Sequence, residues 1–463
     1  MKPVHSAPDI AIAPVRRVNR TLIVYGGFQS LSILGLYAVT VNLPLIAGEL
    51  SFTSSQVVMI ATMYLLGFAI GLPISGRLID AAGFVRIVQW GLIAYAVSSL
   101  LAALVSSLEA LIVLRLIAGL ASSVMAVSGA ILGAQVIGAQ QKLATLSMTM
   151  ALVIMGALAP LIGGLVGDRF GWRVAVALPL VILFVGIPVL RGVRRNLAVA
   201  PNRPQRLDVI GMLLISGVTV GLVFAIQGGL AATGLLALIG LIAVSVVGTI
   251  LWTRSRPKAF VPRAVLTNRS IMLGALVGHF VAAGSAVAYI VLPLYLAARY
   301  NMNPITIGLM ACLAAVIGAV STLIAARVRV RRPKVLLVPL VLLSSVGLAL
   351  VCADNVDLFV RVLAVGLAQS SYGGVHAILL LQAQRDTDSR LQGISIGTFQ
   401  TVFYVGGSVG AALLTSLLRF TDLGTASMLI ALVPLCALPI IWLLRFSPPD
   451  ETHLQADAHE QQT

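Results

Sequence analysis

Apolar runs of about twenty residues recur along the whole chain, and short polar, basic or Gly/Pro-containing segments separate them. A helix needs about 20 apolar residues to cross a hydrocarbon core roughly 30 Å thick. The pattern therefore predicts an all-α polytopic membrane protein with fourteen transmembrane helices. The expected spans cover residues 21–47, 56–76, 87–106, 109–134, 143–167, 174–190, 207–226, 232–253, 270–298, 304–326, 335–352, 356–383, 394–418 and 423–445.

The polar segments divide these spans into a 6+2+6 arrangement. We expect a cytoplasmic leader (1–20), a six-helix bundle (21–190), two basic linkers with two additional helices (191–269), a second six-helix bundle (270–445) and a disordered tail (446–463). A short internal repeat supports this division, because GLASS at residues 119–123 recurs as GLAQSS at residues 366–371. Eight spans separate the two copies, whereas a plain twelve-helix protein would repeat after six.

Composition and charge agree with a membrane protein. The chain is 59% hydrophobic and 10% charged, with a mean hydropathy of +1.04, which excludes an ordinary soluble domain. The net charge of +16 follows the positive-inside rule if both termini are cytoplasmic. On that topology the opposite side receives only Arg169, Arg173, Arg299, Arg361 and Arg419, and Arg115 lies within a span. The charge therefore indicates an orientation in the lipid bilayer and no nucleic-acid partner.

The fifth span is rich in glycine. Its sequence ALVIMGALAPLIGGLVG (151–167) contains Gly156, Pro160, Gly163 and Gly164. Small residues at three- and four-residue spacings let membrane helices approach closely, and neighbouring helices can satisfy the backbone groups that a proline leaves free. We expect this helix to form a packing seam between moving parts.

The loop after the second span reads GRLIDAAGFVR (76–86), with Gly76, Asp80, Gly83 and Arg86 at its key positions. It resembles the loop signature of the major facilitator superfamily. With Arg115, the Pro160–Gly164 stretch and the fourteen-span count, the sequence resembles the fourteen-helix drug:proton antiporter family.

The resemblance implies two six-helix bundles that rock about a central cavity, and a fifth-span motif associated with export in exchange for protons. The sequence also differs from the family pattern at several positions. Ala81 and Phe84 stand where the family usually has basic residues, Ala159 replaces a glycine, and the first span keeps Asn42 and Pro44 but lacks the usual acid.

Two charged residues have a functional and a structural interpretation. Asp80 either holds Arg77 or Arg86 in one state of a gating cycle, or caps a helix. Arg115 lies deep in its span, where an unpaired cation costs about 2.5–3.5 kcal/mol, so it should face the protein interior. There it either contributes to translocation or clamps backbone carbonyls, whereas we expect Arg361 at the membrane rim.

Several polar residues are candidates for lining the cavity. His279 and His376 lie within spans and either carry protons or serve as hydrogen-bonded packing residues. Gln29, Asn42, Gln400 and Tyr404 either line the cavity or join helices. Proton coupling would use a histidine, a rim acid such as Asp80, or the substrate itself.

The acidic residues limit the substrate class. No span holds a carboxylate near its middle, and a fixed cation in a low-dielectric cavity needs a counter-charge. We therefore expect neutral, zwitterionic or anionic amphipathic substrates.

The function expected from the sequence is proton-coupled efflux by a monomer in the bacterial inner membrane, with an uptake carrier or facilitator as the alternative. No P-loop, catalytic constellation, metal-ligand spacing or soluble domain is present in the sequence. The protein is therefore expected not to be an enzyme and to need no cofactor or metal, and a sensor is disfavoured.

Overall fold

The computed structural model describes residues 20–134, 140–196, 208–229, 231–256, 259–327, 333–387 and 392–444. Within these ranges all secondary structure is helical. The N-terminal half contains α1 (Arg20–Ser30), η1 (Leu31–Ile33), α2 (Leu34–Val41), α3 (Leu43–Leu50), α4 (Ser54–Ala82), α5 (Phe84–Leu104), α6 (Leu108–Ala134), α7 (Gln140–Phe170), α8 (Trp172–Ala177) and α9 (Pro179–Asn196). It is followed by α10 (Val209–Gln227), α11 (Ala232–Ser255) and α12 (Arg263–Leu266). The C-terminal half contains α13 (Arg269–Tyr300), α14 (Pro304–Arg327), α15 (Pro333–Val351), α16 (Leu358–Arg385), α17 (Gln392–Leu417), α18 (Leu423–Ile430), η2 (Pro434–Cys436) and α19 (Ala437–Leu443).

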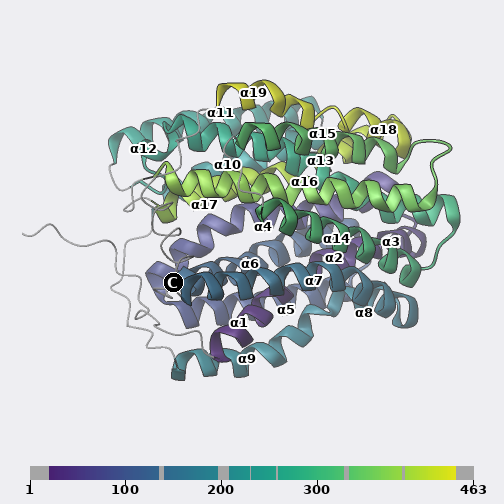
Figure 1. Ribbon diagram of the computed structural model, residues 1–463, viewed down its shortest axis with the longest axis horizontal. Coiled ribbons are helices and arrows are strands. Elements are labelled where there is room, and N and C mark those ends of the chain that lie inside the picture. Colours follow the sequence, from purple (N-terminus) through teal and green to yellow (C-terminus); the bar gives the residue numbers. More distant parts are fainter. Residues whose placement is uncertain are drawn as a thin grey trace, which may run out of the picture.

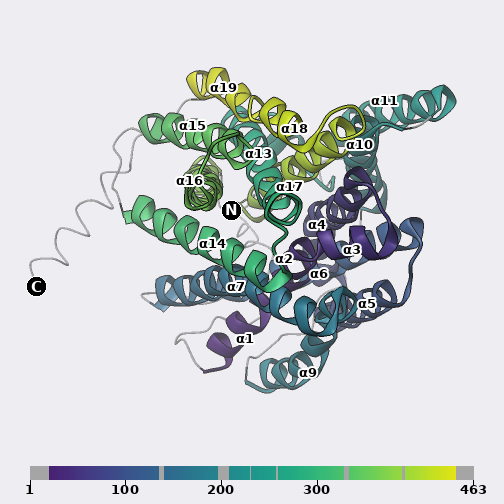
Figure 2. The same cartoon turned by 90° about the vertical axis from the view of Figure 1, so that its right-hand side faces the viewer.

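The helices form two bundles. Helices α1 to α9 pack together, and α13 to α19 pack together beside them (Figures 1 and 2). The pair α10 and α11 is attached through α10, which packs against α17 and α4. The expected leader up to residue 19, the linker residues 197–207 and the tail from residue 445 lie outside the described ranges.

Twelve helical segments of the described residues are long and apolar enough to cross a membrane. The chain is therefore a multi-pass membrane protein. Helices α7 and α17 are not among the twelve, although they have 31 and 26 residues, so the expected count of fourteen stays a prediction. The first expected span is broken into shorter helices, and Pro44 in the first turn of α3 marks one of the breaks because proline provides no backbone donor.

Corresponding glycines of the two halves pack alike. A Cβ atom added to Gly163 in α7 would lie 2.3 Å from the Cα atom of Ala38 in α2. A Cβ atom added to Gly410 in α17 would lie 2.3 Å from the carbonyl oxygen of Ala283 in α13. Both distances are too short for a side chain, so in each half a glycine brings two helix backbones together.

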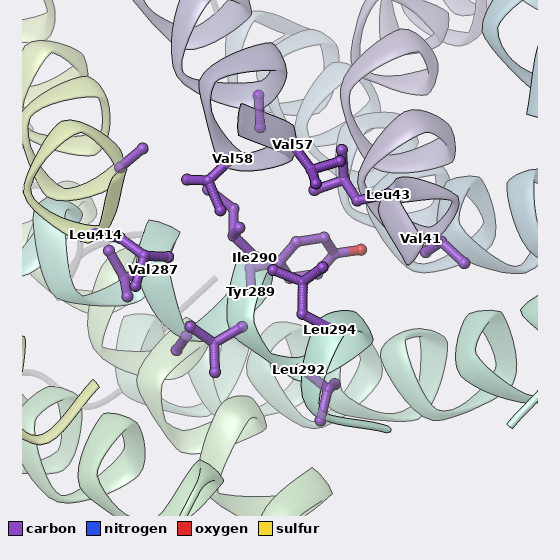
Figure 3. Packing of buried hydrophobic residues seen from close by; sticks show 14 of the residues in the cluster. Val41, Leu43, Val57, Val58, Val287, Tyr289, Ile290, Leu292, Leu294 and Leu414 are labelled. Atoms are coloured by element: carbon purple, nitrogen blue, oxygen red, sulfur yellow. The ribbon is translucent and has the colours of Figure 1, made fainter. Parts of the chain in front are cut away.

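The two bundles share a large apolar cluster at one end of the molecule, where α3, α8 and α18 lie (Figure 1). Figure 3 shows part of it: Val41, Leu43, Val57 and Val58 from the N-terminal bundle meet Val287, Tyr289, Ile290, Leu292, Leu294 and Leu414 from the C-terminal bundle. Toward the opposite end, where α12 lies, each bundle has a cluster of its own. A smaller cluster joins α4, α10 and α17 along one flank. We call the end with the shared cluster the closed end and the opposite end the α12 end.

Candidate translocation site

The glycine-rich part of α7 touches the other bundle. A Cβ atom on Gly164 would lie 2.3 Å from the carbonyl oxygen of Pro304 in α14, and one on Gly308 would lie 2.6 Å from the carbonyl oxygen of Pro160. These contacts are between backbones, so neither glycine can be replaced without moving a helix. The seam expected from the sequence therefore lies between α7 and α14, near the closed end.

The same helix is also fixed to its own bundle. The Asn42 side chain is fully buried, and its Nδ2 donates to the carbonyl oxygens of Ala38 (2.7 Å) and Gly163 (2.8 Å). Gly156 faces Ile33, whose Cδ1 atom would lie 3.7 Å from an added Cβ. Asn42, a candidate for lining the cavity, thus lies in a joint between α2 and α7.

Arg115 is almost completely buried, with 1% of its surface exposed. Its Nη2 donates to the carbonyl oxygen of Gly35 (2.7 Å), and its guanidinium carbon lies 4.4 Å from the centre of the Tyr64 ring. Tyr64 Oη in turn donates to the carbonyl oxygen of Ser32 (3.0 Å). Arg115 Nε and Nη1 have no partner within the described part of the chain. The arginine therefore faces the interior, as expected, and supports the broken first span.

Arg361 makes a similar pair of contacts in the other bundle. Its Nη1 donates to the carbonyl oxygen of Val351 (2.7 Å), and its guanidinium lies 4.6 Å from the centre of the Tyr295 ring. We expected Arg361 at the membrane rim, and it lies in the first turn of α16, next to the last residue of α15. Only 3% of it is exposed.

The gating loop is a tight connection between α4 and α5. Gly83 has φ +96°, a left-handed backbone conformation that other residues rarely adopt. Arg86 is exposed in the first turn of α5, and an added Cβ on Gly76 would have only Val127 within 4 Å, at 3.8 Å. The sharp turn places Arg86 and the last turn of α4 at the α12 end.

Asp80 lies in that last turn, within electrostatic range of Arg77. Arg77 Nη2 also donates to the carbonyl oxygen of Phe260 (2.9 Å), which lies between α11 and α12. A carboxylate near a helix C-terminus is unfavourable without a nearby cation. The arrangement thus favours the ion-holding interpretation of Asp80 over a capping role for its own helix.

The two histidines lie in different surroundings. His279 Nδ1 lies 3.0 Å from the carbonyl oxygen of Val402, so this histidine joins α13 to α17. His376 Nε2 is buried and has no partner among the described residues. The His376 ring lies 4.7 Å from Phe403 and 6.1 Å from Tyr404, measured between ring centres.

Aromatic rings of the two bundles contact each other at two places. Tyr37 of α2 meets Tyr289 of α13 at 4.6 Å, and Phe68 of α4 meets Tyr404 of α17 at 5.3 Å, both edge to face. Tyr372 of α16 lies 6.5 Å from Tyr404, measured between ring centres. We call these five residues the aromatic bridge.

Sequence reasoning named only Tyr404 of this set. The available signal was a tyrosine in the middle of an apolar span, a position where its hydroxyl group needs a partner. Gln400, one helical turn before Tyr404, is partly exposed. The side chain of Gln29 lies outside the described part of the structure.

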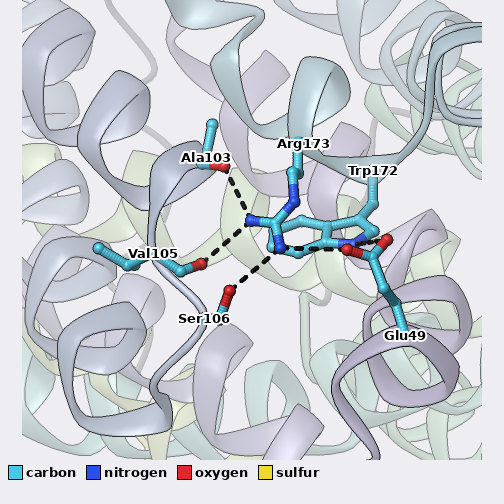
Figure 4. Close-up of polar contacts among 6 residues, drawn as sticks. All are labelled: Glu49, Ala103, Val105, Ser106, Trp172 and Arg173. Atoms are coloured by element: carbon cyan, nitrogen blue, oxygen red, sulfur yellow. Dashed lines mark hydrogen bonds and ion pairs between the residues drawn. The ribbon is translucent and has the colours of Figure 1, made fainter.

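A polar network at the closed end was also missed (Figure 4). Glu49 of α3 accepts a hydrogen bond from Trp172 Nε1 (2.7 Å) and pairs with Arg173 Nη2 (3.1 Å). Arg173 Nη1 also donates to the carbonyl oxygens of Ala103 (3.0 Å) and Val105 (3.2 Å). The network ties α3, α5 and α8 together at this end of the N-terminal bundle.

The amino-acid sequence is similar to a known family and to curated bacterial proteins. The family model described as Major Facilitator Superfamily matches residues 27–411. The "Putative multidrug resistance protein MdtD" of Escherichia coli (strain SMS-3-5 / SECEC) is 28% identical over 283 residues, which are 59% of this chain and 58% of that protein. The protein of the same name from Shigella sonnei (strain Ss046) gives the same values. The match thus spans a little over half the length of these relatives.

Solved structures share the fold. An auto-inhibited peptide transporter of the POT family has a TM-score of 0.70 at 13% identity, with 93% of this chain and 98% of that chain covered. A peptide transporter POT in complex with sulfate has a TM-score of 0.67 at 16% identity, with 93% and 95% covered. At these identities the likeness concerns the fold alone.

Proposed function

The chain belongs to the major facilitator superfamily, and from this premise we propose that it is a secondary active transporter that exports small amphipathic compounds, drugs or metabolites, in exchange for protons. The relatives named multidrug resistance proteins support export over uptake. We propose that the protein lies in the bacterial inner membrane. The family and the related folds indicate a transporter and not an enzyme.

The observation that carries the proposal is the asymmetric contact between the bundles. A large apolar cluster joins them at the closed end, whereas toward the α12 end each bundle has its own core. Alternating access requires an interface that closes one end at a time, with each bundle moving as a unit. In the orientation given by the basic residues, the closed end is extracytoplasmic and the structure is inward-facing.

We further propose that α7 and α17 also cross the membrane, which gives fourteen spans. Each packs along a spanning helix of the opposite bundle, α7 on α14 and α17 on α4. The 6+2+6 partition then places both termini in the cytoplasm, and the inserted pair α10 and α11 lies outside the two bundles.

The substrate is proposed to be neutral, zwitterionic or anionic. The described acidic residues lie at helix ends, as Asp208, Asp357 and Asp422 do as N-caps. Arg115 is a buried positive charge that stacks on Tyr64. A permanent cation would find no counter-charge there.

His376 is the proposed proton-carrying residue of the two histidines. Its Nε2 has no protein partner, whereas the contact of His279 with Val402 gives that residue a structural role. Asp80 remains the proposed gating acid. The protein is proposed to act as a monomer without a cofactor.

Transport in energised membrane vesicles tests the proposal. Everted vesicles that contain the protein should accumulate labelled amphipathic compounds, and a protonophore should abolish this accumulation. Replacing His376 with Gln should remove substrate-induced proton movement, and His279→Gln should retain it. Accumulation in right-side-out vesicles instead would support the uptake carrier, and no flux in either kind of vesicle would reject a transport function.

A further inference from the structure

Two buried polar atoms next to the aromatic bridge have no hydrogen-bond partner within the described part of the chain. They are Tyr289 Oη, on a residue that is 5% exposed, and His376 Nε2. Buried polar groups in native proteins nearly always have a partner, and an unpaired one destabilises the fold. One of these atoms is on the aromatic bridge and the other on a ring next to Tyr404, where a ligand can supply the partners during part of the transport cycle.

The rings around these atoms favour a flat ligand. Tyr289 contacts Tyr37, Tyr37 lies within electrostatic range of Tyr404, and Tyr404 lies 6.1 Å from the His376 ring. One orphaned atom, Tyr289 Oη, thus belongs to the aromatic bridge, and the other, His376 Nε2, is on a ring next to Tyr404. Aromatic faces and edges bind other aromatic rings in stacked or edge-to-face geometry, and the tyrosine hydroxyls both donate and accept hydrogen bonds.

The charges next to the bridge favour a ligand without positive charge. Arg115 lies over the face of the Tyr64 ring, and Tyr64 is within electrostatic range of Tyr37. No Asp or Glu side chain of the described residues is buried, whereas Arg115 is. The positive charge of Arg115 is compatible with a ligand hydroxyl group that can lose its proton, and it repels a ligand with a fixed positive charge.

We infer that the aromatic bridge binds flat aromatic compounds that carry hydroxyl groups and are neutral or weakly acidic. Tyr289 and His376 are the specificity-determining residues, because their unpaired atoms bond the hydroxyl groups of the ligand. The inference rests on the proposed export function and names the substrate class for it.

Calorimetric titration of the purified protein tests the inference with two matched probes, 4′,5,7-trihydroxyflavone and its trimethyl ether. The wild type should bind the trihydroxy compound about a hundredfold more tightly, the effect of two good hydrogen bonds to buried groups. Tyr289→Phe removes only the hydroxyl group, and His376→Phe keeps an aromatic ring but removes both imidazole nitrogens. Each should weaken trihydroxyflavone binding about tenfold and change binding of the ether less than twofold.

Control variants separate this role from a structural one. Tyr300→Phe changes a tyrosine at the end of α13 that is 40% exposed, and His279→Gln changes the histidine that already has a partner. Both should bind the probes like the wild type.

Without ligand, Tyr289→Phe should melt no lower than the wild type, because it removes an unpaired hydroxyl from an apolar cluster. Equal binding of the two flavones, equal losses for both probes in the site variants, or binding of the dication methyl viologen at the affinity of trihydroxyflavone would overturn the inference.

Vesicle transport distinguishes the failure of the site from the failure of export. If trihydroxyflavone binds as described but everted vesicles do not accumulate it, the export function is wrong and the binding site stands. If vesicles export amphipathic compounds and both site variants bind trihydroxyflavone like the wild type, the site is wrong and the export function stands.

Discussion

Two buried arginines make the same kinds of contact but occupy different places. Arg115 and Arg361 each donate to one backbone carbonyl and each lie over one tyrosine ring. Arg115 lies in the interior of the N-terminal bundle beside the broken first span, whereas Arg361 lies in the first turn of α16. Their shared geometry makes Arg361 a matched control for a transport role of Arg115.

Replacing Arg115 with Lys should reduce transport at least tenfold at unchanged membrane abundance. A lysine keeps the charge but loses the planar group that bonds Gly35 and stacks on Tyr64 at the same time. Arg361→Lys should keep most of the transport activity. Vesicle flux and immunoblotting measure both effects, and equal losses of protein from the membrane in the two variants would assign both arginines to folding.

The burial or close packing of some site residues could be predicted from the sequence, because it depends on the residue itself and its neighbours in the chain. The burial of Arg115 follows from the cost of a cation in lipid, and the close packing at Gly164 follows from glycine spacing. The meeting of Tyr37 with Tyr289 depends on how two bundles dock, and 252 positions separate the residues in the chain. A single sequence contains no direct signal of such a contact.

At the level of elements, the seam between α7 and α14 should tolerate no side chain at Gly164. An added methyl group would meet the carbonyl oxygen of Pro304 at 2.3 Å, so Gly164→Ala should lower stability by about 1–3 kcal/mol. Gly192 in α9 is the control, because an added Cβ there has nothing within 4 Å. Gly192→Ala should be neutral or stabilising by up to about 1 kcal/mol. Thermal unfolding of the purified variants measures the difference, and equal melting temperatures would contradict a close-packed seam.

The inserted pair α10 and α11 is fixed at the α12 end by one carboxylate. Asp208 accepts hydrogen bonds from the backbone N–H of Gly211 (3.0 Å), Trp252 Nε1 (2.9 Å) and the backbone N–H of Phe260 (2.6 Å). Since Arg77 of the gating loop donates to the Phe260 carbonyl oxygen, Asp208 connects the pair to the gate.

Asp208→Asn should lower stability by about 2 kcal/mol, because bonds to a charged acceptor are weakened at three donors. Asp357→Asn, at an exposed N-cap where the carboxylate is bonded to the backbone N–H of Phe359, should cost at most about 1 kcal/mol. Chemical or thermal unfolding compares the two variants. A smaller effect at Asp208 than at Asp357 would mean that the inserted pair is fixed by its apolar contacts alone.

The helices could be predicted from hydropathy, but their interruptions could not. The expected span 21–47 contains the 3₁₀ turn Leu31–Ile33, where Ser32 accepts hydrogen bonds from Tyr64 and Tyr95. Tertiary hydrogen bonds stabilise this break, so the local pattern of apolar residues does not reveal it. At Pro44 and Pro434 a proline lies at the start of the segment after the break, which is a local cause because proline provides no backbone donor.

At the scale of the whole molecule, fourteen spans place both termini on the same side of the membrane. Reporter fusions after Gln141, Arg206, Arg263 and His459 should all report the cytoplasm. A periplasmic signal at His459 alone would remove one span, with α17 the first candidate because its many Ser, Thr and Gly residues make it less apolar.

Distances between the bundles at both ends of the molecule test alternating access most directly. Exposed positions are available for spin labels at the closed end (Ser54 and Ala298) and at the α12 end (Gln89 and Thr267), once the native cysteines Cys312, Cys352 and Cys436 are replaced by alanine. Each pair of positions is labelled in its own protein variant and reconstituted in lipid. Pulsed electron–electron double resonance then measures the distance between the two labels with and without a bound substrate at two pH values. We predict two populations in each pair, with the distance at the closed end increasing under the same conditions that shorten the distance at the α12 end. A single unchanged distance at the closed end under all conditions, or opening of both ends together, would contradict transport by alternating access.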